Sequence, residues 1–538
     1  MADVDQAVHS APQSVTDIDY LIVGGGPAGL QLAYYLEQSG RDYVVLEAAQ
    51  VADFFTRLPR HRRLISNNKV HTGFTDRDKN LRWDWNSLLS EDLDHLFSQY
   101  SHEYLPKADD LVRYLRDFRH RFALRVEEGT RVTGVSWRGP GRGFTVRAED
   151  GRVWHPRRLI MATGHTVPYI PEIPGVEFCE EYSRISTDPA DYVNQRVLIL
   201  GKGNSAMETA ENLMHVTAST HVLSPSPVRV AWNTHHVSDV RACYHNTMDS
   251  YQLKMQNTIL DGVPLRIDKG DDGRLRISFR YTHARGQTID LTVDRIILCC
   301  GFRFDYSVFD ETCRLETCHD GRWPKVNSTW EAVGIPDLYF IGALMQARDY
   351  KESFSGFIHG FRYNIRFLDR LFAERYHDTP IVPDTRMPLS PERLSDHIVQ
   401  RAVNASSLFQ LPAFLTDLHV FRPGDEEVSV YHDIPRDHAL DAPAWRDCYK
   451  LTMDLEYGKL PPGADPFAVE RDPLDGTTSQ FVHPVCRLYR GSELVDTYHV
   501  PEDLENEWDK PMYTGPLRDA LASMIKQATQ QDRLSPPA

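Results

Sequence analysis

The sequence predicts an α/β fold with two nested β-α-β domains and a C-terminal accessory module. Three observations indicate this fold. A glycine-rich turn joins a strand to a helix near the N-terminus, a second such turn begins at Gly201, and apolar strands ending in glycine lie between and after the two turns. A chain of 538 residues, 41% of them hydrophobic, is long enough for each part to bury its own core.

The first β-α-β unit has an apolar strand at residues 20–23, a glycine-rich turn at 24–29, a helix at 30–38 and a second strand at 43–47. The turn matches G-x-G-x-x-G. Its first glycine permits the turn, the second lets a pyrophosphate approach the backbone, and the third packs the helix on the strand. The acid that ends the second strand is placed to accept a ribose hydroxyl. The residues predicted to bind this first dinucleotide are Gly24, Gly26, Pro27, Ala28, Gly29 and Glu47.

The second unit repeats this pattern, with a strand at 196–200, a turn at 201–206, a helix to about residue 213 and a strand at 220–223. Its second strand ends without an acid. Ser224 and Arg229 follow instead, and a hydroxyl and a guanidinium suit a 2′-phosphate, so we expect NADPH rather than NADH. The alternative for Arg229 is a solvated surface charge. The residues predicted to bind this second dinucleotide are Gly201, Gly203, Asn204, Ser205, Ala206, Ser224 and Arg229.

Two further apolar strands, at 159–164 and 294–301, indicate crossings between nested domains. A strand at 338–342 and a helix at 356–375 return the chain to the first domain, and Thr163, Gly164 and Gly342 are added to the first dinucleotide site. Four prolines between 380 and 391 indicate a linker. The predicted divisions are 1–165 and 292–378 for the first domain, 166–291 for the second, and 379–538 for an accessory module of unassigned fold.

A basic and polar run at 57–69 lies close in sequence to the first unit. We expect Asn67, Asn68 and Lys69 to face an active site, with a solvated face as the alternative. Arg241 is predicted to bind a carboxylate or phosphate, and an ion pair with Asp239 or Asp249 is the equal alternative. The adjacent histidines 235 and 236 lack further ligands at metal-binding spacing, so no metal is expected.

Composition excludes several other classes. Lys and Arg total 60 against 76 Asp and Glu, and a net charge of −16 opposes nucleic-acid binding. No apolar stretch is long enough for a membrane span. The first 17 residues do not form a signal peptide, and residues 534–538 carry no retention signal, so a cytoplasmic location is expected. The eight cysteines have no Cys-x-x-Cys spacing, which disfavours a redox-active disulfide.

Both glycine turns, together with Asp294, Leu298, Gly301 and Phe302 at D-x-x-x-L-x-x-G-F spacing, resemble the class B flavin monooxygenases. In their N-hydroxylating members Ala-Thr stands where this chain has Cys299-Cys300. A closer resemblance is to the FAD-dependent oxidoreductase-domain family that includes the endoplasmic-reticulum flavoprotein associated with degradation. It is carried by Phe54-Phe-Thr-Arg57, Pro59-Arg-His-Arg62, Asp84-Trp-Asn-Ser-Leu-Leu-Ser90, Gly203-Asn-Ser-Ala206, Glu208-Thr-Ala-Glu-Asn212, Tyr251-Gln-Leu-Lys254 and Gly356-Phe-Ile-His-Gly-Phe-Arg-Tyr363.

The resemblance implies FAD in the first domain and NADPH in the second. It also implies N-oxygenation through a C4a-hydroperoxyflavin, as in the branch that oxidises L-aspartate to nitrosuccinate. Asn67 or Asn68 would then shield the flavin adduct, and Lys69, Arg241 and Arg362 would bind the substrate's carboxylates. The expected partners are a small amine or amino acid and molecular oxygen, and a homodimer is left open. The alternatives are a thiol/disulfide flavin oxidoreductase and a non-catalytic FAD-binding protein.

Overall fold

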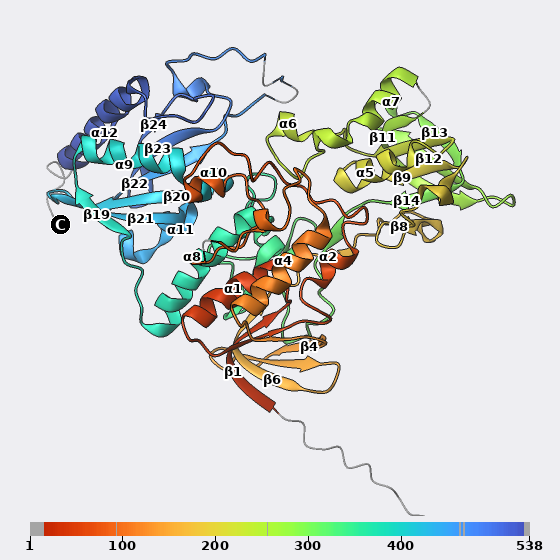
Figure 1. Ribbon diagram of the computed structural model, residues 1–538, viewed down its shortest axis with the longest axis horizontal. Coiled ribbons are helices and arrows are strands. Elements are labelled where there is room, and N and C mark those ends of the chain that lie inside the picture. Colours follow the sequence, from red (N-terminus) through yellow and green to blue (C-terminus); the bar gives the residue numbers. More distant parts are fainter. Residues whose placement is uncertain (1–14, 93, 255–256, 462–463, 466–467, 532–538) are drawn as a thin grey trace, which may run out of the picture.

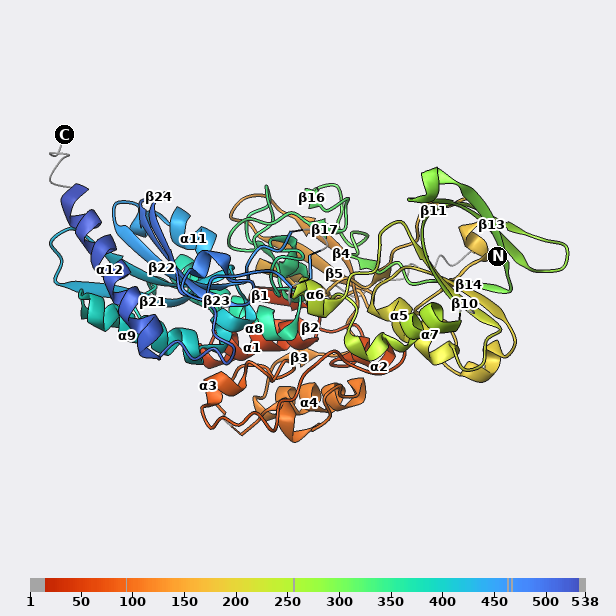
Figure 2. The ribbon, with the colours of Figure 1, turned by 90° about the horizontal axis from the view of Figure 1, so that it is seen from above.

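A computed structural model describes residues 15–92, 94–254, 257–461, 464–465 and 468–531. Two seven-stranded sheets and one six-stranded sheet form its framework. Figures 1 and 2 show the first domain in the middle of an elongated molecule, with the second domain at one end and the C-terminal module at the other. The predicted α/β fold class is thus confirmed. Residues 1–14 and 532–538, used in the prediction of location, lie outside the described residues.

The first sheet has the order β3-β2-β1-β6-β5-β4, and β18 pairs with the second half of β6. Residues 20–23 of β1 are buried on both faces, which explains their unbroken apolar run in a largely parallel sheet. The strands are β1 (Val15–Val23), β2 (Tyr43–Leu46), β3 (Val126–Glu127), β4 (Val132–Trp137), β5 (Phe144–Ala148), β6 (Val153–Met161) and β18 (Leu338–Phe340).

One face of this sheet is covered by α1 (Pro27–Gln38), α4 (Ala108–Arg121) and α8 (Ile358–His377), whose apolar side chains share a core with β1 and β2. The strands β4 and β5 and the segment 304–344 contribute to the core on the other face. Two short helices, α2 (Asp53–Arg57) and α3 (Arg77–Asn80), belong to the loop that follows β2.

The second sheet has the order β13-β12-β11-β10-β9-β14-β8. Its strands are β8 (Glu180–Glu181), β9 (Arg196–Leu200), β10 (Ser219–Ser224), β11 (Thr258–Lys269), β12 (Leu275–Tyr281), β13 (Thr288–Val293) and β14 (Arg295–Leu298). Its helices are α5 (Asn204–Leu213), α6 (Ala231–Thr234) and α7 (Asn246–Lys254). The predicted boundary at residue 292 is wrong, because β14 pairs in parallel with β9 and therefore belongs to this sheet.

Two strands connect the first and second domains as a small antiparallel ribbon. They are β7 (Val167–Pro168), which leads into the second domain, and β15 (Phe302–Arg303), which leads out of it. The Tyr169 N–H also donates to the Gly301 carbonyl at 2.9 Å. A second small ribbon, β16 (Thr317–Cys318) with β17 (Trp323–Pro324), lies in the segment that returns the chain to β18.

The C-terminal module is an antiparallel sheet of order β19-β21-β20-β22-β23-β24. Its strands are β19 (Thr385–Pro388), β20 (Leu415–Phe421), β21 (Glu427–Pro435), β22 (Tyr449–Glu456), β23 (His483–Arg490) and β24 (Glu493–His499). Helices α9 (Pro391–Asn404) and α12 (Pro511–Gln531) share a core with one face, and α10 (Ser406–Gln410) and α11 (Arg436–Asp441) flank it. Leu418 and Ile434 join the core that contains α8, so the module is packed against the first domain. Among the described helices, none has the length and apolar character needed to cross a membrane.

Candidate functional site

The turn between β1 and α1 has the geometry of a dinucleotide cradle. Gly24 has φ +113°, and a Cβ there would lie 2.7 Å from the Ala162 carbonyl oxygen. A Cβ on Gly29 would lie 2.0 Å from the Gly24 carbonyl oxygen, so neither position accepts a side chain. Gly26, which caps α1, has no atom within 4 Å of its Cβ direction and leaves the helix N-terminus open to a phosphate.

Glu47, which is predicted to bind a ribose, lies beside this turn. Its Oε2 accepts the Gly25 N–H at 2.7 Å and its Oε1 accepts the Ala49 N–H at 3.0 Å. Burial raises the pKa of this carboxyl, while the two backbone N–H groups lower it. Gly342, with φ +75°, approaches the first turn of α1 so closely that a Cβ would lie 2.6 Å from the Ala28 Cβ. The ends of β1, β2, β6 and β18 therefore meet at one edge, and their residues fit a bound dinucleotide.

The second turn reproduces the first. Gly201 has φ +124°, and a Cβ there would lie 2.2 Å from the Cys299 carbonyl oxygen. Gly203 caps α5 with φ −84° and ψ −175°, close to the −82° and −175° of Gly26, and is also open. Ala206 is fully buried, as close packing of helix on strand requires. Cys299 thus takes the place that Ala162 has in the first domain.

The other residues predicted for the second dinucleotide lie in different surroundings. The Asn204 amide donates to the Ser238 and Asp239 carbonyls at 2.9 and 3.0 Å, so it is committed within the protein. Arg229 is half exposed, in agreement with the alternative of a solvated surface charge, and it forms an ion pair with Asp239 at 3.3 Å. The Ser205 carbonyl accepts the hydroxyl of Thr209 at 2.7 Å within α5.

A cation at this site was missed by the sequence reasoning. The Lys202 Nζ donates to the Ser226 carbonyl at 3.0 Å and forms an ion pair with Asp261, and the hydroxyl of Ser224 donates to the same Ser226 carbonyl at 3.1 Å. Burial lowers the pKa of Lys202, while Asp261 raises it. The signal in the sequence is the lysine between Gly201 and Gly203, which faces the end of β10.

Residues 230–241, here called the bridging loop, connect all three parts of the protein. The loop closes on itself, because the Ala231 N–H donates to the Val240 carbonyl at 2.9 Å. Toward the first domain, Asp239 forms an ion pair with Lys351 at 2.5 Å, and the His236 Nε2 lies 3.1 Å from the Ser353 carbonyl.

Arg241 ends the bridging loop and lies between the second glycine turn and the loop that follows β2 in the first domain. Its N–H donates to the Asn204 Oδ1 at 3.0 Å, its Nη2 donates to the Ser66 carbonyl at 3.2 Å, and its guanidinium lies 5.4 Å from the Trp85 ring centre. Its Nη1 is buried without a hydrogen-bond partner. The centre of the His359 ring lies 4.8 Å from the centre of the Trp85 ring. The His359 Nε2 is also buried and has no hydrogen-bond partner. Neither predicted ion pair of Arg241 forms, and its guanidinium keeps a free donor for a ligand.

Arg362 is a correction. It is fully buried, its Nη1 donates to the Asp84 and Ser87 carbonyls at 2.9 and 2.8 Å, and its Nη2 donates to the Leu81 carbonyl at 2.8 Å. The side chain fastens the 81–87 segment to α8. It is therefore not available to a substrate.

Asn67, Asn68 and Lys69 follow Ser66, whose carbonyl accepts a hydrogen bond from Arg241. Asn68 is exposed, and its Oδ1 accepts the His71 N–H at 3.1 Å to close a turn. Asn67 accepts the Asn68 N–H at 2.9 Å. The Lys69 Nζ is buried and donates to the Glu103 carbonyl at 2.5 Å. Asn67 and Asn68 thus make contacts within their own segment, and Lys69 contacts Glu103.

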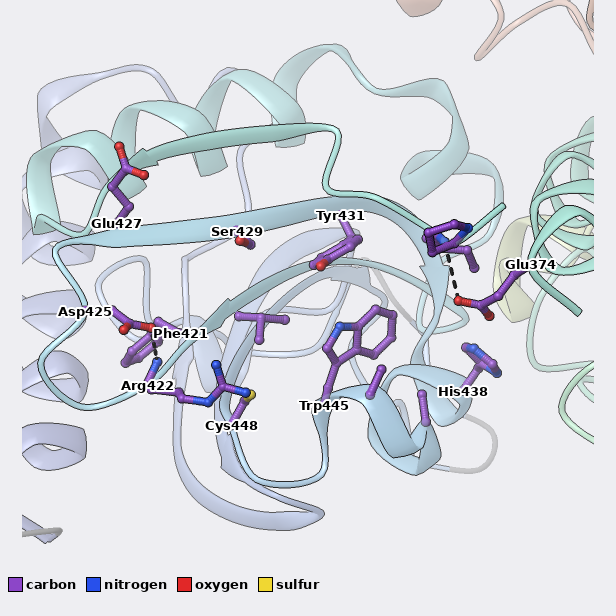
Figure 3. Close-up of a pocket in the computed structure, with 15 residues that line it drawn as sticks. Glu374, Phe421, Arg422, Asp425, Glu427, Ser429, Tyr431, His438, Trp445 and Cys448 are labelled. Carbon is purple, nitrogen blue, oxygen red and sulfur yellow. Dashed lines mark hydrogen bonds between the residues drawn. The ribbon is translucent and has the colours of Figure 1, made fainter. Parts of the chain in front are cut away.

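Two surface cavities lie on the C-terminal module, away from the glycine turns. One, of about 330 Å³, is lined by Trp445, Tyr431 and His438 beside the end of α8 (Figure 3). The other, of about 520 Å³, contains Arg366 and His432. Neither includes a residue of the two turns or Arg241, so we assign the candidate site to the two turns and Arg241 because of their geometry.

The described cysteines form no disulfide. All eight described cysteines are free, and burial raises the pKa of Cys300 to about 11 and that of its neighbour Cys299 further. Both thiols are therefore protonated and unreactive at neutral pH. Within the described part of the chain, no group of three or more His, Cys, Asp or Glu side chains is arranged to hold a metal ion.

Residues 21–342 match the family model for pyridine nucleotide-disulphide oxidoreductases. FAD-dependent oxidoreductase domain-containing protein 2 of Mus musculus is 36% identical over an alignment of 574 positions, which covers 96% of this chain and 86% of that protein. Among solved structures, an FAD-bound cadaverine monooxygenase of desferrioxamine biosynthesis from Erwinia amylovora aligns with TM-score 0.53 and 14% identity, over 69% of this chain and 100% of its own. A bacillithiol disulfide reductase from Staphylococcus aureus aligns with TM-score 0.52 and 19% identity, over 67% and 100%.

Proposed function

Because the chain belongs to the FAD-dependent oxidoreductase domain-containing protein 2 family, we propose that it is a monooxygenase that oxygenates the nitrogen of a small amine or amino acid. FAD would be held by Gly24, Gly26, Gly29 and Glu47, and NADPH by the turn at 201–206. When bound, FAD supplies the redox chemistry between NADPH and oxygen. Each oxygenation consumes one NADPH, one proton and one O₂, and yields an N-hydroxylated product, NADP⁺ and one water.

The observation that carries the proposal is the position of Arg241. A guanidinium with a buried, unpartnered Nη1 lies where the second dinucleotide turn meets the first domain, beside Asn204 and Trp85, and we expect the substrate to bind at this boundary. A carboxylate is the natural partner, since a charge-assisted hydrogen bond contributes about 1.5–3 kcal/mol. Of the three cations predicted to bind carboxylates, Arg362 is excluded and Lys69 donates to a backbone carbonyl. The site therefore supports recognition of one carboxylate, and L-aspartate is the first substrate to test.

The surroundings of Arg241 also favour a reactive nitrogen. An amine must lose its proton before it can act as a nucleophile, and both burial and a neighbouring positive charge lower the pKa of an ammonium. Burial lowers the pKa of His359 well below its ordinary value, so this imidazole is neutral at pH 7. The His359 Nε2 is then free to exchange a hydrogen bond with the substrate's nitrogen.

The preference for NADPH rests on the end of β10. The last residue of β10 is Ser224 and not an acid, and Lys202 supplies a cation beside Ser224 and Ser226. Its partner Asp261 offsets part of that charge. A bound 2′-phosphate would therefore draw on Lys202 first, and Arg229 would have to leave Asp239 to join it.

The test is anaerobic mixing of the FAD-loaded protein with NADPH, followed by oxygen, with L-aspartate, L-alanine, cadaverine and succinate compared in parallel. We expect NADPH to bleach the flavin. Oxygen uptake should be coupled to a nitrogen-oxygenated product, detected by mass spectrometry, with an amine that carries a carboxylate. Succinate, which lacks the amine, is the control for binding without chemistry.

The two alternatives give other results. A thiol/disulfide oxidoreductase would reduce a disulfide with NADPH and would lose activity on cysteine alkylation. This alternative is tested because the S. aureus disulfide reductase shares the fold of this chain. Flavin that NADPH never bleaches would point to a non-catalytic FAD-binding protein. Either result would overturn the monooxygenase proposal.

A further inference from the structure

The C-terminal module contacts the bridging loop at His235. The ring of Tyr457 stacks on the His235 ring at 4.8 Å with an interplanar angle of 15°, and the ring of Phe481 meets it edge-on at 5.4 Å and 78°. Tyr457 directly follows β22 and Phe481 lies just before β23, so the contact is made at the open end of two paired strands. Figures 1 and 2 show α6 beside this β22–β23 connection.

Other contacts strengthen this junction. The Asn233 Nδ2 lies 3.4 Å from the Ala464 carbonyl, at the limit of a hydrogen bond. His235 has a left-handed backbone with φ +55°, a conformation that non-glycine residues adopt only where neighbouring contacts hold them. The aromatic contacts are the external support that His235 has in this region.

The bridging loop can transmit this support to the substrate site. Val230 and Val240 are joined by a parallel β-bridge, so the segment between them is closed into a single unit. Arg241 follows that bridge directly. A shift of His235 at one side of the closed loop therefore displaces the backbone that carries the guanidinium at the other.

We propose that Tyr457 and Phe481 are positioning residues, through which the C-terminal module holds the bridging loop and sets where Arg241 lies in the substrate site. The module thereby completes a site whose other parts come from the two dinucleotide domains. This inference rests on the proposed role of Arg241 in binding a carboxylate. An aromatic pair of this kind stabilises a contact enough for about a three- to tenfold effect when it is lost.

The experiment compares Tyr457→Ala with the matched control Tyr457→Phe, which keeps the ring, in the full FAD-loaded chain. Hydrogen–deuterium exchange of peptides covering 230–241 reports the loop, and peptides of α1 report the rest of the fold. We expect faster exchange in 230–241 for Tyr457→Ala alone, with α1 unchanged. The KM for the carboxylate-bearing amine should rise about three- to tenfold, with kcat changed less, and Tyr457→Phe should behave as wild type.

His235→Ala provides the second variant, in case the first fails to fold. If His235 and Tyr457 act as one contact, the double variant should be no worse than either single one. Unchanged exchange in 230–241 would overturn the proposal, and so would faster exchange with an unaltered KM. If no amine is oxygenated by the wild type, the monooxygenase proposal fails. Hydrogen–deuterium exchange then still tests whether Tyr457 holds the bridging loop. The affinity for succinate, measured as a change in flavin fluorescence, tests the position of Arg241.

Discussion

Glu208 on α5 makes the stability of the second domain depend on pH. The carboxyl is buried, its Oε1 accepts the Tyr244 hydroxyl at 3.3 Å, and burial raises its pKa from 4.5 to about 7. The folded protein therefore keeps this proton up to about pH 7, whereas the unfolded chain releases it near pH 4.5. Since the folded state binds more protons between these values, stability falls as the pH rises through that window.

Replacing Glu208 with Gln removes the free-energy cost of ionising this buried carboxyl. The difference between about 7 and 4.5, at about 1.4 kcal/mol per pH unit, sets an upper bound of about 3 kcal/mol at pH 8. At pH 5 most of that gain is absent, because the wild-type carboxyl is still protonated. We expect Glu208→Gln to raise the free energy of unfolding by roughly 1–3 kcal/mol at pH 8 and by much less at pH 5.

The assay is thermal unfolding of both proteins between pH 5 and pH 8, where about 1 kcal/mol corresponds to roughly 2–4 °C for a domain of this class. Glu211→Gln is the matched control. It removes the same charge from the same helix, but Glu211 is only half-buried and accepts the Asn246 amide at 3.0 Å. A gain for Glu208→Gln that is equal at pH 5 and pH 8, or matched by Glu211→Gln, would refute the argument from burial.

Three further predictions concern the candidate site. Arg241→Ala should raise the KM for a carboxylate-bearing substrate by about 10- to 100-fold, because one charge-assisted pair is lost, and Arg241→Lys should restore only part of the affinity. Steady-state kinetics tests this, and an unchanged KM would remove Arg241 from the site. Gly29→Ala should purify without flavin, because it puts a Cβ 2.0 Å from a carbonyl oxygen. Gly515→Ala, in open space on α12, is the control and should keep the flavin, and the ratio of visible to ultraviolet absorbance measures both. Lys202→Ala should raise the KM for NADPH at least about tenfold with little effect on NADH, and an equal effect on both nucleotides would argue against contact with the 2′-phosphate.

The sequence was sufficient to predict both dinucleotide turns, because their glycines are required by the backbone itself. Gly24 and Gly201 face carbonyls that leave no room for a side chain, and that constraint is local enough to be visible as a spacing. The direction of a long side chain is set by tertiary contacts. Arg362 lies within the motif 356–363, yet it donates to the Asp84 carbonyl, and Arg229 forms an ion pair with Asp239.

The C-terminal module was unassigned for a related reason. Its central strand β22 carries Lys450, Asp454 and Glu456, charges that normally indicate a solvated face. In the structure Arg436 and Arg487 form ion pairs with Asp454 and Glu456 beneath the surface, at distances of 2.5–3.1 Å. The residues of β22 alternate between apolar and polar, which by itself indicates a strand with one solvated face, but the structure buries the polar face as well.

Because β7 pairs with β15, the second domain begins and ends at neighbouring points of the structure. The strand that enters the domain and the strand that leaves it run side by side, with Val167 opposite Arg303 and Pro168 opposite Phe302. Excision of everything beyond this point leaves two chain ends that a tight hairpin turn can join without moving either strand. A domain with paired ends can also be exchanged between proteins as a unit. A first domain that receives a different second domain in this way would use another reductant while its own core stays unchanged.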